Sequence, residues 1–350
     1  MPSQRALSRL GRVALAVLTV LALVGCVPGA GSSDVPRRLA AESGAGPIHT
    51  TLNLYAYAVP KVAYDELVPA FRRTPAGAGV AVQQSFGASG DQSRKVVSGA
   101  AADIVNFSVE PDITRLVEAG LVEPDWRAGA HGGVPYGSVV TLVVRAGNPK
   151  NIRDWDDLLR PGIEVVMPNP FSSGSAKWNL LAPYAAKSDG GRNPAAGLAY
   201  VEELVHDHVE LQPKSGREAT EAFLQGTGDV LLSYENEALF IERKGEPVEH
   251  ITPAVTIRVD NPAAVLAASP NRDAAQRFLD FMNSADGQRI LAETGFRPAD
   301  PDIAREFAAE FPAPDQLWSI DDLGGWAAVE ANLFKAGTGS IAQIYEGVAR

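Results

Sequence analysis

Cysteine is almost absent from this chain of 350 residues, in which Cys26 is the only one. A single cysteine excludes an intramolecular disulfide, so core packing alone must stabilise the fold. Runs of about 20 apolar residues, the length a helix needs to cross a bilayer, are also missing. The apolar run at residues 13–24 is well short of that length. We therefore expect no permanent transmembrane helix in a chain long enough for two packed lobes.

Basic residues are scarcer than acidic ones, with 31 Lys and Arg against 42 Asp and Glu and a formal net charge of -11. No basic block interleaved with aromatic residues occurs, which excludes nucleic acid as the expected partner. An acidic chain attracts anions poorly as a whole. Any anion site must therefore consist of local dipoles and hydrogen-bond donors.

The N-terminus has the layout of an export signal. Arg5, Arg9 and Arg12 precede the apolar run, and the run ends in residues 23–26, Leu-Val-Gly-Cys. This ending resembles the lipobox of bacterial lipoproteins, in which the cysteine becomes the lipidated first residue. We predict a signal peptide over residues 1–25, a membrane anchor through lipidated Cys26, and a flexible Gly/Ser/Pro-rich tether over residues 26–47.

From residue 50 onward, short β-branched runs alternate with amphipathic ones, which predicts an α/β fold with parallel sheets covered by helices. Strands are expected at residues 51–57, 80–86, 102–108, 138–145, 164–170, 209–213 and 229–234, with helices between them. The alternation restarts midway, which predicts two lobes. We assign residues 48–140 and 253–325 to lobe 1, residues 141–252 to lobe 2 and residues 326–350 to C-terminal helices. Crossings near residues 141–145 and 252–258 are the predicted hinges.

Three loops that each follow a strand and precede a helix are candidates for ligand binding. They cover residues 86–92, 169–176 and 214–220, and each is rich in Ser and Gly. Ligands of open parallel sheets bind at the carboxyl ends of the strands. Such loops offer amides, hydroxyls and the positive end of a helix, which together can hold a small anion. Ser89 is expected as an N-cap, and Asp91 and Glu218 as residues that stabilise helix dipoles.

Ordered motifs along the exported part resemble the bacterial sulfate-binding family, the receptors of sulfate and thiosulfate ABC importers. They are residues 87–92 (GASGDQ), 102–105 (ADIV), 144–150 (VRAGNPK), 152–158 (IRDWDDL), 168–170 (PNP), 173–179 (SGSAKWN), 228–231 (GDVL) and 235–238 (ENEA). The resemblance implies a two-lobed fold of the type II periplasmic binding proteins, with a mostly parallel sheet flanked by helices in each lobe. It also implies a monomeric substrate-binding partner of an ABC importer permease rather than an enzyme, without cofactor or metal.

The same resemblance implies which residues donate hydrogen bonds to the anion. Carried over by position, these are Ala58, Ser89, Ser173, Gly174, Ser175, Gly216 and Tyr234. The chain departs from the family pattern at Ala88, at Ser175, at Tyr234 where the family has Trp, and most of all at residues 57–61. A phenol can accept as well as donate a hydrogen bond, unlike an indole.

Two kinds of alternative remain at this point. The same fold could bind phosphate, molybdate or tungstate, although a site made only of donors favours sulfate, which carries no proton at neutral pH. A secreted serine hydrolase is the remote alternative, because residues 87–90 (GASG) superficially resemble a nucleophile loop. Asp91 stands where that motif requires Gly, and S-x-x-K is absent from the chain. His206 and His208 are two apart, so on a helix their rings diverge and no metal site is expected.

Overall fold

The computed structural model describes residues 47–348. The predicted signal peptide, Cys26 and all of the predicted tether except residue 47 lie outside the described residues, so these assignments stay predictions.

The first sheet consists of four strands in the order β10-β3-β1-β2. These are β1 (Thr50–Tyr57), β2 (Val80–Gly87), β3 (Ile104–Asn106) and β10 (Ala263–Val265). β1 runs parallel to β2 and β3, whereas β10 is antiparallel to β3. Side chains of β1 point alternately to the two faces of the sheet. Leu52 and Leu54 belong to one apolar cluster, and Tyr55 packs against a different one. The strand thus has two buried faces, as expected where helices cover both sides of a sheet.

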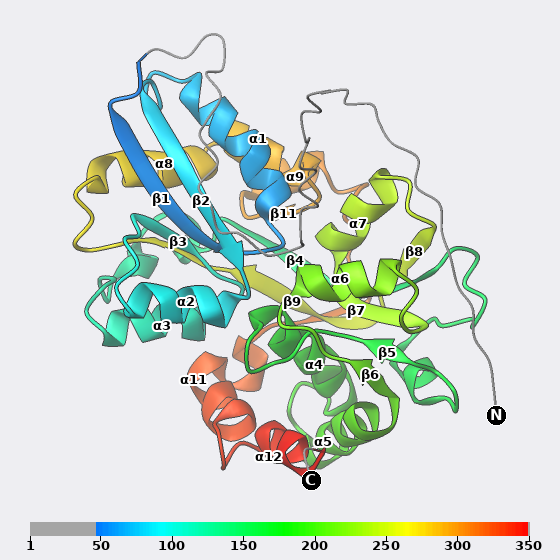
Figure 1. Ribbon diagram of the computed structural model, residues 1–350. Coiled ribbons are helices and arrows are strands. Elements are labelled where there is room, and N and C mark those ends of the chain that lie inside the picture. The colour runs from blue at the N-terminus through cyan, green and yellow to red at the C-terminus, as the bar shows by residue number, and fades with distance from the viewer. Residues whose placement is uncertain (1–46, 349–350) are drawn as a thin grey trace, which may run out of the picture. The chain divides into compact units, whose positions relative to one another are not determined.

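Helices cover both faces of this sheet (Figure 1). Apolar residues of α1 (Lys61–Arg72), α8 (Arg272–Met282) and α9 (Ala285–Glu293) share a cluster with Leu52 and Leu54. Residues of α2 (Ser89–Val97) and α3 (Glu110–Glu118) form the cluster on the opposite face.

The second sheet has eight strands, with β12-β9-β4-β7-β5-β6 as its main order and with β8 and β11 also paired to β4. They are β4 (Tyr136–Arg145), β5 (Val165–Val166), β6 (Val209–Leu211), β7 (Val230–Tyr234), β8 (Val248–Ile251), β9 (Val255–Asn261), β11 (Arg297–Pro298) and β12 (Gln316–Trp318). β5 is parallel to β6 and β7, and β12 is parallel to β9. β4 is antiparallel to each of its partners, so this sheet is mixed.

The long strand β4 also separates two buried layers. Val140, Leu142 and Val144 face the core that includes α4 (Gly174–Lys187) and α5 (Pro194–Glu203). Val143 belongs instead to the cluster with α6 (Gly216–Leu224) and α7 (Glu235–Arg243). This alternation of consecutive side chains between two faces is the geometry of a pleated strand.

The C-terminal part of the chain contains α10 (Pro301–Glu306), α11 (Gly325–Val329), a π-helical turn (Glu330–Phe334) and α12 (Ser340–Val348). α10 packs against α9 and β11, whereas α12 packs against α5 beside the second sheet (Figure 1). The Trp326 ring meets the Trp178 ring edge to face, with centroids 4.8 Å apart. Such contacts attach α11 to α4.

The predicted α/β class is confirmed, since the described residues form two sheets, each flanked by helices. The first sheet is mostly parallel as expected, whereas the second is mixed because each partner of β4 runs antiparallel to it. The exact lobe boundaries and hinges stay predictions. No helix within residues 47–348 combines the length and apolarity that a bilayer span requires. The same residues contain no group of three or more His, Cys, Asp or Glu placed to hold a metal ion.

Candidate functional site

A small cavity lies where loops following strands of both sheets meet. It has a volume of about 10 Å³, close to what one water molecule requires. Its walls consist of Tyr57, Ala58, Val59, Gly87, Ala88, Ser89, Ser108, Ser173, Ser175, Ser215 and Gly216. None of these residues carries a carboxylate, an ammonium, a guanidinium or an imidazole. The segments follow β1, β2, β3, β5 and β6 at their carboxyl ends, which is where open α/β sheets bind ligands.

A second cavity of about 720 Å³ is much larger. It is bordered by β4, β9 and α11, and its size is in the range of about 300–1,000 Å³ that is usual for organic ligands. Each arginine in its wall already faces a carboxylate: Arg127 pairs with Glu110, Arg258 with Asp260, and Arg297 with Glu235. The small cavity is therefore the better candidate for an inorganic anion.

Three helices begin at the small cavity. They are α2, α4 and α6, which start at Ser89, Gly174 and Gly216. Within residues 47–348, no acceptor pairs with the backbone N–H groups of Ser89, Gly174, Ser175 and Gly216. These amides are among the first-turn donors that a helix cannot satisfy by itself, and each helix adds the positive end of its dipole. The arrangement provides donors for a negative charge without supplying a cation.

Five of the seven predicted donors line the small cavity, and Gly174 and Tyr234 do not. Ala58, Ser89, Ser173, Ser175 and Gly216 line the cavity. Gly174 is not part of its wall but lies between Ser173 and Ser175, and a Cβ built on it would be 2.9 Å from the Ser108 Cβ. Tyr234 is 1% exposed and lies behind the wall rather than in it. The binding role of all seven stays a prediction.

The hydroxyls of Ser173 and Ser175 form a pair, with their oxygens 2.7 Å apart. Only one of the two protons is used in this hydrogen bond, so one remains for a ligand. Ser173 is the N-cap of α4, and its side chain makes no capping bond. Ser215, by contrast, caps α6 by accepting from the Glu218 N–H at 3.3 Å. Accepting this bond does not use the Ser215 proton, so hydroxyls on both the α4 side and the α6 side can donate to a ligand.

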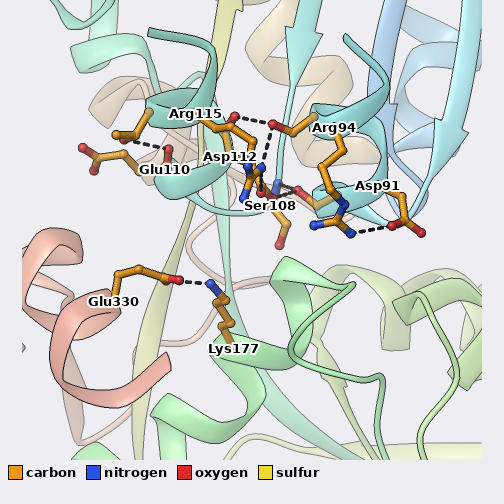
Figure 2. Close-up of polar contacts among 11 residues, drawn as sticks. Asp91, Arg94, Ser108, Glu110, Asp112, Arg115, Lys177 and Glu330 are labelled. Carbon is orange, nitrogen blue, oxygen red and sulfur yellow. Dashed lines mark hydrogen bonds and ion pairs between the residues drawn. The ribbon is translucent and has the colours of Figure 1, made fainter. Parts of the chain in front are cut away.

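The expectation that Ser89 is an N-cap is wrong. Ala88 is the N-cap of α2, and Ser89 is the first helical residue. The reason is a competing partner: the Ser89 hydroxyl donates to Asp112 Oδ2 at 2.6 Å and accepts from the Ser108 N–H at 3.0 Å. Asp112 is 4% exposed and also accepts from Arg115 at 2.7 Å. Figure 2 shows Asp112 and Arg115 beside Ser108. The Asp112 carboxylate thus contacts Ser89, which lines the cavity, but does not line the cavity itself.

The carboxylates that the sequence placed in first helical turns point elsewhere. Asp91 pairs with Arg94 at 2.5 Å, and both side chains are more than two-fifths exposed (Figure 2). Glu218 accepts from the Lys214 N–H at 3.0 Å. Neither residue lines the cavity. Their position is consistent with stabilising helix N-termini, the role expected for them.

Ser108 is the cavity residue that the sequence analysis missed. It is fully buried, and its hydroxyl oxygen lies 2.7 Å from the Tyr234 hydroxyl oxygen. Burial raises the pKa of the Tyr234 phenol well above its ordinary value. A signal was available, because Ser108 follows β3 and precedes α3, in a fourth loop of the same kind. This loop lacks the Gly-rich composition by which the other three were recognised.

Further hydrogen bonds join segments of the two sheets beside the cavity. The Gly90 N–H donates to the Ser172 carbonyl at 3.1 Å, and Arg217 donates to the Val59 carbonyl at 3.3 Å. Arg217 also forms an ion pair with Glu237 at 3.0 Å. These contacts hold the walls of the cavity together in the conformation described here.

Comparison with known proteins gives consistent matches over most of the chain. Residues 52–297 match the family model described as bacterial extracellular solute-binding protein. The sulfate-binding protein of Synechococcus elongatus is 35% identical over 340 residues, covering 94% of this chain and 94% of that protein. The thiosulfate-binding protein of Pseudomonas aeruginosa is 34% identical over 304 residues, covering 83% of this chain and 90% of that protein.

A solved structure also resembles the chain. The sulfate-binding protein SubI from Mycobacterium tuberculosis H37Rv is 60% identical, with a TM-score of 0.81, and covers 82% of this chain and 100% of that chain. All of these relatives are named as binding proteins rather than as enzymes. The resemblance inferred from the sequence motifs is thereby confirmed.

Proposed function

The chain belongs to the bacterial extracellular solute-binding proteins and, among them, to the sulfate-binding protein family, and from this membership we propose that it captures sulfate or thiosulfate for an ABC import permease. The observation that supports the proposal most directly is the composition of the small cavity. Its wall contains backbone amides and hydroxyls and no ionisable group other than Tyr57. A fully deprotonated oxyanion can accept from every donor of such a wall.

The protonation state of the ligand is the basis on which the cavity would distinguish sulfate from phosphate. Sulfate has no proton to donate at neutral pH, whereas hydrogen phosphate needs an acceptor for its proton. The first-turn carboxylates Asp91 and Glu218 do not supply that acceptor. We therefore favour sulfate or thiosulfate over phosphate. Molybdate and tungstate carry the same charge and differ from sulfate mainly in size, so they remain alternatives for the binding experiment.

Isothermal titration calorimetry tests this proposal. The mature domain, prepared free of sulfate and phosphate, is titrated separately with sulfate, thiosulfate, phosphate and molybdate, and perchlorate serves as a tetrahedral anion with a single charge. We expect binding of one sulfate or thiosulfate per chain and no heat with perchlorate or phosphate. A folded protein that responds to phosphate but not to sulfate or thiosulfate would overturn the proposal.

Lipid anchoring and delivery to a permease are further parts of the proposal. Support for the anchor comes from the basic residues, the apolar run and the lipobox-like ending at Cys26. Expression in a bacterium that is fed a clickable fatty acid should label the native chain. The Cys26→Ala variant should lose the label, whereas Ser32→Ala, a substitution six residues further on, should keep it. Labelling of Cys26→Ala would contradict the anchor.

A serine hydrolase has no comparable support from the site. The Ser89 hydroxyl donates to the Asp112 carboxylate instead of to an imidazole. The cavity wall contains no histidine, although a base within hydrogen-bond reach of the nucleophile is what such catalysis needs. A fluorophosphonate probe that labelled Ser89 would restore this alternative.

A further inference from the structure

The hydroxyl of Ser89 has no proton left for a ligand. A serine hydroxyl carries one proton and can accept at two lone pairs. The Ser89 proton is directed to Asp112 Oδ2 at 2.6 Å, and one lone pair accepts from the Ser108 N–H at 3.0 Å. Because Asp112 is also fixed by Arg115, giving this proton to a ligand would leave a buried carboxylate with one partner fewer. The Ser89 hydroxyl is thus fully used in hydrogen bonds within the protein.

Ser108 and Tyr234 differ from Ser89 in having a proton to spare. Their oxygens are 2.7 Å apart, so one proton forms the bond between them and the other is free. Of the two, only Ser108 lines the cavity. An anion in the cavity would attract the free proton, which selects the arrangement in which Tyr234 donates to Ser108 and Ser108 donates to the anion. Burial raises the pKa of Tyr234 and so favours the proton-bearing phenol that this arrangement needs.

The backbone of Ser108 is fixed on several sides. Its N–H is held by Ser89, and its carbonyl oxygen accepts from Trp178 Nε1 at 2.8 Å and from Asn261 Nδ2 at 3.3 Å. A Cβ built on Gly174 would lie 3.1 Å from the Ser108 hydroxyl oxygen. The Ser108 hydroxyl is therefore held next to the first turn of α4, beside the Ser173 and Ser175 pair shown above. Donors from both sheets converge there.

We propose that Ser108 is a side-chain donor to the bound oxyanion, that Tyr234 is a positioning residue acting through Ser108, and that the Ser89 hydroxyl has a structural role. This inference rests on the proposed function and deepens it. It replaces the direct Tyr234 contact implied by family resemblance with a contact from Ser108, and it leaves the backbone amide of Ser89 as the donor of that residue.

Affinity measurements on single and double variants test the inference. Sulfate binding is measured by calorimetry for the native mature domain and for Ser108→Ala, Tyr234→Phe and the double variant, with folding checked by circular dichroism. Ser108→Ala should weaken binding by about 10- to 100-fold, the usual effect of losing a hydrogen bond to a charged group. Tyr234→Phe should weaken it less, because Ser108 keeps its own proton. The double variant should bind about as weakly as Ser108→Ala alone.

The double variant also guards against misfolding, because it removes both hydroxyls and leaves neither buried without a partner. Ser188→Ala is the matched control: Ser188 is also buried, its hydroxyl accepts from the Gly191 N–H at 2.9 Å at the C-terminal end of α4, and it is not part of the cavity wall. It should bind sulfate as the native protein does. Ser89→Ala should lower the melting temperature while its backbone amide still donates to the ligand.

The outcomes separate the inference from the proposed function. If the folded native domain binds neither sulfate nor thiosulfate, the proposed function fails. If the native domain binds sulfate and Ser108→Ala binds it equally well, the inference alone is overturned. It is also overturned if the losses from Ser108→Ala and Tyr234→Phe are equal and add up in the double variant, since Tyr234 would then be an independent donor.

Discussion

The backbone N–H of Gly90 donates a hydrogen bond of 3.1 Å to the carbonyl oxygen of Ser172. Gly90 is in the first turn of α2, beside the first sheet, and Ser172 is in the loop before α4, beside the second sheet. A Cβ built on Gly90 would lie 3.0 Å from that same oxygen. The close approach of the two loops therefore depends on the absence of a side chain at position 90.

Gly90→Ala should weaken sulfate binding while the fold remains stable. The new methyl group would push the Ser172 carbonyl away and disfavour the arrangement in which the two loops meet. Alanine is the better helix former by about 0.8–1 kcal/mol, so the melting temperature without ligand should not fall. We expect calorimetry to give a dissociation constant raised about 3- to 10-fold, a change of about 0.7–1.4 kcal/mol.

The control for this substitution is Gly129→Ala, because nothing lies within 4 Å of a Cβ at that position and its φ of -75° suits any residue. Its sulfate affinity should equal that of the native domain. An unchanged affinity in Gly90→Ala would show that the Gly90 to Ser172 contact has no part in binding.

Lys177 and Glu330 should affect anion affinity in opposite directions. They form an ion pair at 2.6 Å between α4 and the C-terminal π-helical turn (Figure 2). Lys177 lies in the helix whose first turn borders the cavity, so its charge adds to the field there. Lys177→Met should lower sulfate affinity about 2- to 5-fold at low salt, and Glu330→Gln should raise it by a similar factor.

Added salt is the check on this electrostatic interpretation. Both differences should shrink as ionic strength rises, because screening acts over about 10 Å at 0.1 M. Two variants that changed affinity in the same direction, or by a factor independent of salt, would point to packing around Lys177 and Phe334 instead of to charge.

The alternation of short apolar runs with amphipathic ones was sufficient to predict the fold class. The predicted strand at residues 51–57 corresponds to β1, whose start is shifted by one residue, and the helix expected after this strand corresponds to α1. Periodicity was informative here because both faces of the sheets are buried, so strands and helices carry distinct patterns. The antiparallel partners of β4 were not foreseen, since pairing between distant segments leaves no trace in local pattern.

The site was predicted less completely than the fold. Loops rich in Ser and Gly after strands led to Ser89, Ser173 and Gly216, which the structure brings together in one cavity wall. Ser108 was missed because its loop contains no glycine, and only the position after β3 marks it. The hydrogen bond from the Ser89 hydroxyl to Asp112 could not be predicted, because the two residues are 23 positions apart in the sequence and only the folded structure shows that their side chains meet.

Arg297 and Glu235 should be important for stability. The guanidinium meets both carboxylate oxygens, at 2.7 and 2.8 Å, and joins β11 to the first turn of α7. Glu235 is only 2% exposed, so removing its partner leaves a buried charge without compensation. Arg297→Ala should lower the free energy of unfolding by about 3–5 kcal/mol, measured by urea denaturation.

Arg289 provides the matched control, because it also makes two hydrogen bonds to one carboxylate, that of Glu306, on an exposed surface. Arg289→Ala should lower the free energy of unfolding by at most about 1 kcal/mol. Equal costs for Arg297→Ala and Arg289→Ala would contradict the view that burial, and not pairing geometry, determines the effect.

Glu237 should make stability depend on pH in a definite direction. Burial raises the pKa of its carboxyl above the ordinary value of 4.5, although the Arg217 guanidinium opposes the shift. Between the ordinary and the folded-state pKa, the folded protein holds one proton more than the unfolded chain, so the free energy of unfolding falls as pH rises through that window. The stability of Glu237→Gln relative to the native domain should therefore increase from pH 4.5 upwards, as measured by urea denaturation at successive pH values. Glu66→Gln, which neutralises an exposed carboxylate on the distant helix α1, is the control and should follow the native profile. A constant difference between Glu237→Gln and the native domain across this range would mean that Glu237 titrates alike in the folded and unfolded states.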